Sequence, residues 1–225
     1  MVCLLALLLQ VGAAAQEREP VGSGPEPSPT PISWQVELRF SDPKRLEVLL
    51  PGRSQPDVFW YMLYTATNTS DATQWFYPTF QVVTGDLRVV ETDVGINPLV
   101  FAAIRERHRL THPYLTAPAQ AIGELKSGGD NARESVAIWP AADVDVNQFA
   151  IYVGGLSGET RVLRNPAYDP SRPETATLDS GREITINPRY FTLRKTLEIR
   201  YELPGSAAAR RTAEPQRRSV RWIMR

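Results

Sequence analysis

The chain has 225 residues, of which 25 are basic and 25 acidic, so its formal net charge is zero. This balance excludes the strong overall positive field on which non-specific nucleic-acid binding depends, and we expect no nucleic-acid partner. Cys3 is the only cysteine. An intrachain disulfide is therefore excluded, and an apolar core must hold the fold.

A mainly apolar run over residues 2–11 is followed by Ala13, Ala14 and Ala15. Small residues after such a run are typical of a signal-peptidase site, although no Lys or Arg precedes the run. The run is shorter than the roughly 20 apolar residues that cross a bilayer. We therefore expect a signal peptide over residues 1–15, cleavage near Ala15, and export to the periplasm or the cell exterior without a transmembrane span. Exported chains without disulfides are typical of bacterial envelopes, which we take as the location.

Residues 16–32 are rich in Pro, Gly, Ser and Glu. This composition cannot bury a core and favours an extended, solvated chain. We therefore predict a linker here, followed by a single folded domain over residues 33–225.

The first strands of this domain are predicted from the spacing of apolar side chains. Apolar and polar residues alternate over residues 34–40, which is the period of a strand with one face on a core. Asp42 and Pro43 then predict a turn into a second strand over residues 45–50. Residues 58–67 are apolar or aromatic on both faces, which is typical of a central strand covered on both sides.

The next stretch predicts a hairpin with aromatic side chains on its outer face. Three apolar side chains share the face expected on the core: Phe76, Phe80 and Val82. Trp75 and Tyr77 share the opposite face, and Pro78 indicates an edge position or a bulge. Residues 84–86 supply the turn, and residues 87–91 the returning strand.

One helix is predicted over residues 97–111. Asn97 supplies the N-cap, Pro98 suits the first helical position, and His112-Pro113 ends the pattern. Further strands are expected at the apolar runs 121–125, 135–139 and 149–153. The pattern is therefore all-β with one inserted helix.

The last third of the chain joins a polar connection to the clearest strand pattern. Residues 164–189 carry four prolines and predict a long loop with a short strand at 183–186. Residues 191–203 alternate between apolar and polar side chains. Lys195 is the one charge on the apolar side, and it predicts a bend in a strand of unusual length.

A basic segment ends the chain. Residues 205–225 contain six arginines and one acidic residue, Glu214, and their last strand is expected to turn Val220, Trp222 and Met224 inward. Such a segment can hold an anionic lipid, polysaccharide or nucleic acid. The simpler interpretation, which we prefer, is solvated charge flanking a strand.

Three stretches resemble parts of known exported domains. Residues 64–70, YTATNTS, resemble the strand and turn of bacterial extracellular immunoglobulin-like modules. Residues 123–139 and 149–157 resemble the paired late strands of similar domains, and the whole chain resembles uncharacterised exported proteins of planctomycete-type bacteria. The resemblance implies an immunoglobulin-like β-sandwich and brings no catalytic residue with it. The cystine pair of antibody-type domains is missing.

His108 and His112 are four residues apart on the predicted helix, as in a metal-binding pair. The zinc-peptidase motif needs Glu where Arg109 stands, and spacing identifies no third ligand. We interpret the pair as helix surface and expect no metal or other cofactor.

Ser157 lies in the sequence GLSGE, which differs at its last residue from the G-x-S-x-G turn of serine hydrolases. Both histidines precede Ser157, the reverse of the chain order in that fold. We therefore predict a turn without a catalytic role.

Residues 143–147, DVDVN, imitate the start of a calcium loop. Gln148 stands where such a loop needs glycine, and Gly154 where it needs glutamate. A plain connection between strands is favoured, and bridging by a cation stays open. Residues 68–70 fit a glycosylation sequon, which we interpret as a turn.

No catalytic constellation emerges, so we predict a non-enzymatic binding or structural module with a protein or polysaccharide partner in the envelope. Trp75 and Tyr77 are candidate contacts, with Trp60 and Tyr64 as further candidates, because exposed rings stack on sugars or anchor proteins. Covering of these rings by the helix or the long loop is the plainer outcome. The alternative is a carbohydrate-binding or carbohydrate-active protein that adds carboxylates from residues 164–189. Two carboxylates about 5–9 Å apart beside a ring would favour the enzyme.

Overall fold

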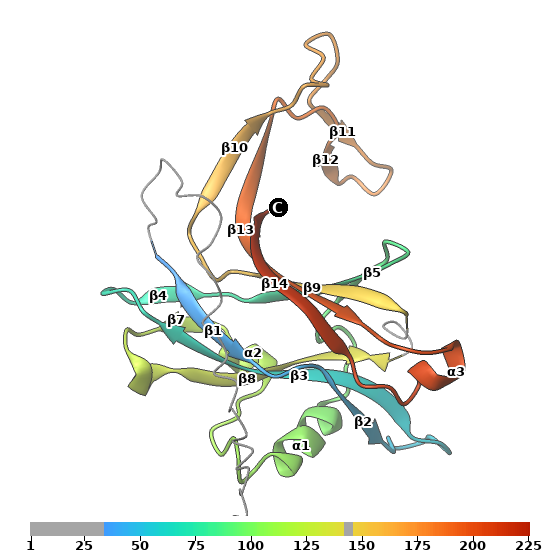
Figure 1. The fold of residues 1–225 in the computed structure, drawn as a ribbon. Helices are drawn as coiled ribbons and strands as arrows, with labels where there is room; N and C mark the ends of the chain where they lie inside the picture. The colour runs from blue at the N-terminus through green and yellow to red at the C-terminus, as the bar shows by residue number, and fades with distance from the viewer. Residues whose placement is uncertain (1–33, 142–145) are drawn as a thin grey trace, which may run out of the picture.

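The computed structural model describes residues 34–141 and 146–225 (Figure 1). This part of the chain is mostly β-sheet with few helices, as predicted. The expected signal peptide and linker over residues 1–32 lie outside the described residues, as do Asp143 and Asp145 of the calcium-like stretch.

The first sheet is built on β3 (Asp57–Asn68), which pairs along both of its edges. One edge holds β8 (Arg133–Pro140). The other edge holds both β1 (Val36–Phe40) and β2 (Lys44–Val48), end to end. A strand with neighbours on both sides is central, as the apolar pattern of residues 58–67 predicted.

Asp42 and Pro43 form a bulge, and the turn predicted there is wrong. Phe40, at the end of β1, pairs with Tyr64 of β3, and Lys44, at the start of β2, pairs with Tyr61. The edge strand therefore advances by four residues while β3 advances by three. One extra residue is thereby inserted, which kinks the edge strand without reversing it. Pro43 suits this place because it has no N–H to give to a ladder.

The second sheet is antiparallel and has five main strands. They follow one another in the order β6 (Val89–Glu91), β5 (Thr79–Thr84), β9 (Gln148–Gly154), β13 (Tyr190–Glu202) and β14 (Gln216–Met224). The hairpin predicted over β5 and β6 is confirmed.

The inner faces of the two sheets pack on each other around one apolar core. Trp60, Met62 and Trp139 enter it from the first sheet, and Val82 and Ile151 from the second, each with no more than 1% of its surface exposed. Removal of these side chains from water is the main force that holds the sheets together.

Helix α1 (Pro98–Arg107) covers the other face of the first sheet. Val100 and Ile104 are fully buried there, in a second apolar cluster with Phe59 of β3. The side chain of Asn97 accepts a hydrogen bond from the N–H of Leu99 at 3.0 Å, so the predicted cap is confirmed. The helix ends earlier than expected.

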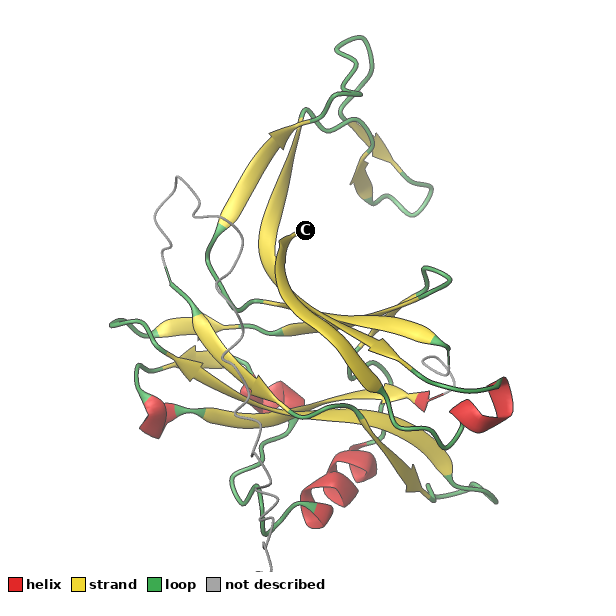
Figure 2. Ribbon diagram, in the orientation of Figure 1, coloured by secondary structure: helices red, strands yellow, loops and turns green. Residues whose placement is uncertain are grey.

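The other helices are short and lie at the periphery of the strands (Figure 2). They are α2 (Pro118–Ala121), α3 (Ala207–Arg210) and the 3-10 turn η1 (Gly129–Asn131). The sequence predicts a strand over residues 121–125. Because α2 ends at Ala121, the strand is shorter and consists of β7 (Gly123–Leu125). It pairs with β4 (Gln74–Phe76) in a small separate sheet.

Residues 160–194 form an arm that rises from the second sheet (Figure 1). At its base, β10 (Thr160–Arg164) pairs with the first part of β13. Beyond them, β11 (Thr175–Thr177) pairs with β12 (Glu183–Thr185). Every residue of β10 is exposed, so the arm adds little to the core.

The connection predicted over residues 164–189 is therefore the outer part of this arm, and the short strand expected at 183–186 is β12. Lys195 marks the boundary between arm and body. The residues of β13 before it are exposed or partly exposed, while Lys195 and the four residues after it are buried.

Candidate functional site

Trp75 and Tyr77 face solvent, with 66% and 57% of their surfaces exposed. Phe76 between them is fully buried, and alternation along the strand turns its neighbours outward. Trp60 and Tyr64, the other two candidate contacts, are only 1% and 3% exposed. They are core residues, and neither offers a flat ring face to a ligand.

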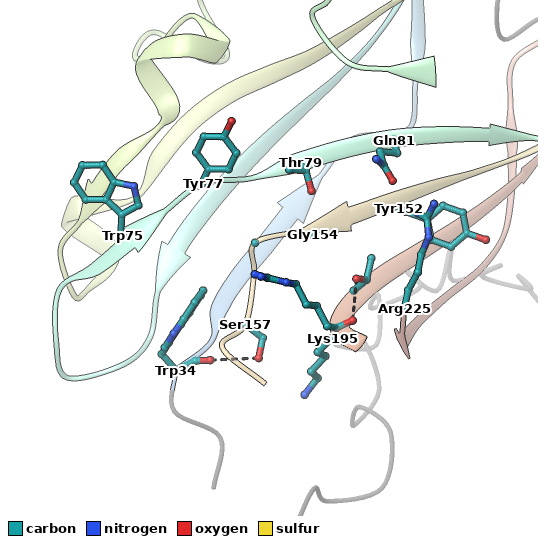
Figure 3. A pocket seen from close by; sticks show the side chains of 13 residues that line it. Trp34, Trp75, Tyr77, Thr79, Gln81, Tyr152, Gly154, Ser157, Lys195 and Arg225 are labelled. Atoms are coloured by element: carbon teal, nitrogen blue, oxygen red, sulfur yellow. Dashed lines mark hydrogen bonds between the residues drawn. The ribbon is translucent and has the colours of Figure 1, made fainter. Parts of the chain in front are cut away.

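A groove of about 530 Å³ lies beside the two exposed rings, on the outer face of the second sheet (Figure 3). Thr79 of β5, Gly154 of β9 and Thr196 of β13 form part of its lining. These residues are small and lie on three adjacent strands, which leaves space above the sheet. Trp75 and Tyr77 lie at one end of the groove.

Two consecutive glycines allow the chain to pack closely at this end of the groove. A Cβ atom on Gly154 would lie 2.6 Å from Oγ1 of Thr79, and one on Gly155 would overlap the carbonyl oxygen of Tyr77. Gly155 also has φ of +76°, a conformation that favours glycine. The chain leaving β9 therefore runs directly against the backbone of Tyr77, which fixes where that ring stands.

Tyr152 and Arg225 lie at the other end of the groove (Figure 3). The guanidinium carbon of Arg225 sits 4.3 Å from the centre of the Tyr152 ring, in a cation–π contact. The Tyr152 hydroxyl donates to Oε1 of Glu198 at 2.9 Å. Burial, followed by this hydrogen bond, raises the pKa of Tyr152, so its hydroxyl stays protonated at neutral pH.

Glu198 anchors an ion-pair network beside this end of the groove. Its side chain is 2% exposed, and Arg200 and Arg221 both donate to its carboxylate. Burial alone would raise the pKa of Glu198, but hydrogen bonds from Arg221, Arg200 and Tyr152 outweigh it and lower the pKa to about 2. The ionised carboxylate thus holds Tyr152 in place.

Arg194 and Lys195 line the groove at the base of the arm. The Lys195 ammonium is buried, 3.1 Å from Oε2 of Glu159, so its charge is balanced. Arg194 is exposed and has no carboxylate partner among the described residues. No Asp or Glu is found among the described residues that line the groove.

Trp34 and Ser157 also line the groove. The Ser157 hydroxyl donates to the carbonyl oxygen of Trp34 at 3.4 Å and accepts from the N–H of Glu159 at 3.1 Å. These bonds use the hydroxyl within its own turn, and Ser157 has no histidine beside it. Both histidines follow α1, beyond the outer face of the first sheet.

His108, one of the two histidines, is bonded within the fold. Nε2 of His108 lies 2.9 Å from the Tyr61 hydroxyl. Burial, with the nearby charges of Lys44, His112 and Arg107, lowers the pKa of His108, so it is neutral at pH 7. Within residues 34–141 and 146–225, no three His, Cys, Asp or Glu side chains are grouped to hold a metal ion.

Asn68, the acceptor of the possible sequon, is fully buried at the end of β3. Its amide group donates to the carbonyl oxygens of Ala72 and Leu125 at 2.8 and 2.9 Å, and its oxygen accepts from the N–H of Ser70 at 3.0 Å. The side chain therefore shapes a turn and is not available to a glycan.

Half of the arginines in the basic C-terminal segment are paired with carboxylates within the fold. Three of its six arginines form ion pairs: Arg217 with Asp42, Arg218 with Glu202, and Arg221 with Glu198. These three arginines lie on β14 in the second sheet and are held by ion pairs, so they do not belong to a free basic tail. Arg225, at the groove, is paired with an aromatic ring instead.

Comparison with protein-family models, curated proteins and solved structures found no match to this chain. In the part of the chain that the structure describes, no helix is both long and apolar enough to cross a bilayer. The geometry of the groove is therefore the basis for a functional proposal.

Proposed function

We propose that this chain is an exported, non-enzymatic binding module of the bacterial cell envelope, and that its groove binds carbohydrate. The observation that carries the proposal is the pair of exposed rings, Trp75 and Tyr77, at one end of a groove with a small polar floor. Export and the bacterial envelope are supported by the apolar run and alanines before residue 16 and by the lack of cysteine after Cys3.

Carbohydrate suits this groove because it presents two kinds of surface. The C–H faces of a sugar ring are apolar and flat, and they stack on aromatic rings, which large exposed side chains such as Trp75 and Tyr77 provide. Sugar hydroxyls need partners that both donate and accept, and the side chains of Thr79 and Gln81 supply these along the groove.

We also propose that the fold is an immunoglobulin-like β-sandwich. Support comes from two antiparallel sheets that share one core and from the YTATNTS stretch at the end of β3. On this proposal, helix α1 and the arm of residues 160–194 are additions to the basic plan.

The carbohydrate-active alternative has less support. A glycosidase needs two carboxyl groups at the scissile bond, whereas the described lining of the groove has none. The carboxylates of residues 164–189 lie on the arm, and no residue of this range lines the groove. The geometry therefore favours binding over hydrolysis.

The proposal is tested by calorimetric titration with three soluble probes, cellohexaose, chitohexaose and an oligogalacturonate. We expect at least one to bind, and Trp75→Ala and Tyr77→Ala each to weaken that binding about tenfold, the usual effect of losing an aromatic anchor. Tyr114→Ala is the matched control, because Tyr114 is 81% exposed and does not line the groove. Failure of all three probes, or equal binding by the Trp75 and Tyr77 variants, would overturn the proposal.

A further inference from the structure

We infer that the carbohydrate held by the groove is an acidic polysaccharide whose carboxylates pair with Arg194 and Arg225. This inference rests on the proposed carbohydrate-binding function and adds the charge of the ligand to it. It comes from the way in which the second sheet distributes arginines over its outer face.

Arg194 and Arg225 lie directly opposite each other, on β13 and just after β14. The N–H of Arg194 donates to a main-chain oxygen of Arg225 at 2.7 Å, and the N–H of Arg225 donates to the carbonyl oxygen of Arg194 at 3.0 Å. Two such bonds define a hydrogen-bonded cross-strand pair, with both side chains on one face. Both side chains line the groove.

Like charges placed opposite each other destabilise a sheet unless a counter-charge lies between them. Lys195, the third cation of the groove, does not need one, because Glu159 is 3.1 Å away. For the side chains of Arg194 and Arg225 no Asp or Glu partner is present in the described part of the chain. The pair is therefore a place where an anionic ligand gains energy and relieves repulsion at once.

The rest of the same sheet face is arranged differently. Arg200 and Arg221 share the carboxylate of Glu198, and Arg218 pairs with Glu202. Each of these arginines thus has a carboxylate partner within the fold. Arg194 and Arg225, which have no Asp or Glu partner among the described residues, line the groove beside the exposed rings, and this links the two features to one ligand.

The chemistry of the guanidinium favours a carboxylate. The guanidinium of Arg225 lies over the ring of Tyr152, and no hydrogen bond of its N–H donors is found in the described part of the chain. A guanidinium edge matches a carboxylate with two parallel hydrogen bonds. A uronic-acid chain offers both a flat sugar face for Trp75 or Tyr77 and a carboxylate for the two arginines that line the groove.

The probe is an oligogalacturonate, compared with the same oligomer after methyl esterification, which removes its charges and keeps its sugar rings. At low salt we expect the acid form to bind at least tenfold more tightly than the ester. Arg194→Gln and Arg225→Gln should each weaken binding of the acid about tenfold and leave binding of the ester unchanged. Arg161→Gln is the matched control, because Arg161 is an exposed arginine of β10 outside the groove.

The outcomes separate the inference from the proposed function. Equal affinity for acid and ester, or unchanged binding by both groove variants, overturns the inference while the carbohydrate proposal stands. Trp75-dependent binding of chitohexaose without binding of the acid does the same. Equally tight binding of polyglutamate, an acidic chain without sugars, overturns the polysaccharide identity of the ligand.

A second readout needs no ligand. If Arg194 and Arg225 repel each other, Arg194→Gln should raise the melting temperature of the free protein at low salt, and the gain should shrink as salt is added. Arg161→Gln should have no such effect. A fall in melting temperature for Arg194→Gln would show that the pair is already neutralised, which overturns the inference.

Discussion

The two sheets of this protein differ in how many of their faces are covered. The first sheet is buried on both sides, by the second sheet on its inner face and by Val100 and Ile104 of α1 on its outer face. The second sheet has an apolar layer packed only on its inner face. Its outer face carries the groove, although Thr196 and Glu198 on that face are buried. The comparison indicates that the first sheet supplies stability on two sides, whereas the second has one face to spare for binding.

The uncovered face is built from polar contacts that cross the strands. Gln81 of β5 lies opposite both Glu91 of β6 and Tyr152 of β9, and Tyr152 lies opposite Glu198 of β13. Gln81 donates to Oε1 of Glu91 at 2.7 Å, and Tyr152 to Glu198 at 2.9 Å. Such cross-strand pairs hold side chains in place without covering them, which is what a binding surface requires.

The largest expected change in stability concerns the buried ion pair of Lys195 and Glu159, at the boundary between the second sheet and the arm. Glu159→Gln would leave the buried Lys195 ammonium without its opposing charge, and we expect a loss of about 4 kcal/mol in the free energy of unfolding. Urea denaturation measures it. The exposed pair of Arg39 and Glu37 is the control, where Arg39→Gln should cost less than about 1 kcal/mol.

The double variant Lys195→Met with Glu159→Leu should recover most of the stability lost in Glu159→Gln, because an apolar pair of similar size replaces both charges. If Glu159→Gln lowers the free energy of unfolding as little as Arg39→Gln does, water reaches the Lys195 ammonium. The boundary between body and arm would then lie deeper in the sheet than this residue.

The second test concerns the covered outer face of the first sheet. Ile104→Ala should lower the free energy of unfolding by about 3 kcal/mol, because it opens a cavity between α1 and β3. Leu110→Ala, at a side chain 85% exposed, should change it by less than about 0.5 kcal/mol. Similar values for the two variants would show that α1 is only loosely attached, and the contrast between the sheets would disappear.

Burial could be predicted from the sequence where it depends on neighbouring residues of a single strand. Phe76, Phe80 and Val82 are buried while Trp75 and Tyr77 are exposed, because alternation along a single strand decides this. The N-cap of α1 at Asn97 is likewise predicted from neighbouring residues, whereas the end of the helix at Arg107 is not. The sequence does not decide whether Trp60 and Tyr64 are exposed, because β3 is apolar on both faces and has no polar side to identify the exterior.

The groove was not predictable, because it depends on register between distant strands. Arg194 and Arg225 meet only when β13 pairs with β14, and Tyr152 joins them through the pairing of β9 with β13. Alternation in residues 191–203 placed Arg194 on the polar side but named no neighbour. Likewise, Asp42-Pro43 suits a turn or a bulge equally, and only the pairing of both flanking strands with β3 decides between them.

The smallest expected effect lies at the seam between the two sheets, where Asp93 follows β6 and its N–H donates to the carbonyl oxygen of Ile138 in β8 at 3.0 Å. Oδ2 of Asp93 accepts from the Thr92 hydroxyl, while Oδ1 is buried without a hydrogen-bond partner in the described structure. Burial outweighs the hydrogen bonds and raises the pKa of Asp93 from 3.8 to about 6. The folded state therefore binds a proton more readily than the unfolded state does.

This shift sets the sign of a pH dependence. Between about pH 4 and pH 6 the folded protein holds the proton and the unfolded chain has released it, so the contribution of Asp93 to stability falls as pH rises through this window and levels off above it. Glu198 acts in the opposite direction and at lower pH. Its pKa is lowered from 4.5 to about 2, so its contribution is lost only as pH falls below about 4.5.

Asp93→Asn removes the charge and tolerates the φ of +62° at this position, where most side chains are strained. We expect the variant to be more stable than the natural chain by about 2 kcal/mol at pH 7.5. The difference should shrink as pH falls through this window, because Asp93 is protonated in the folded state below about pH 6 and in both states only below about pH 4. Urea denaturation at pH 4, 6 and 7.5 measures it. A variant that is less stable at pH 7.5 would show that the ionised carboxylate has a partner, and that the seam between the sheets is open to water.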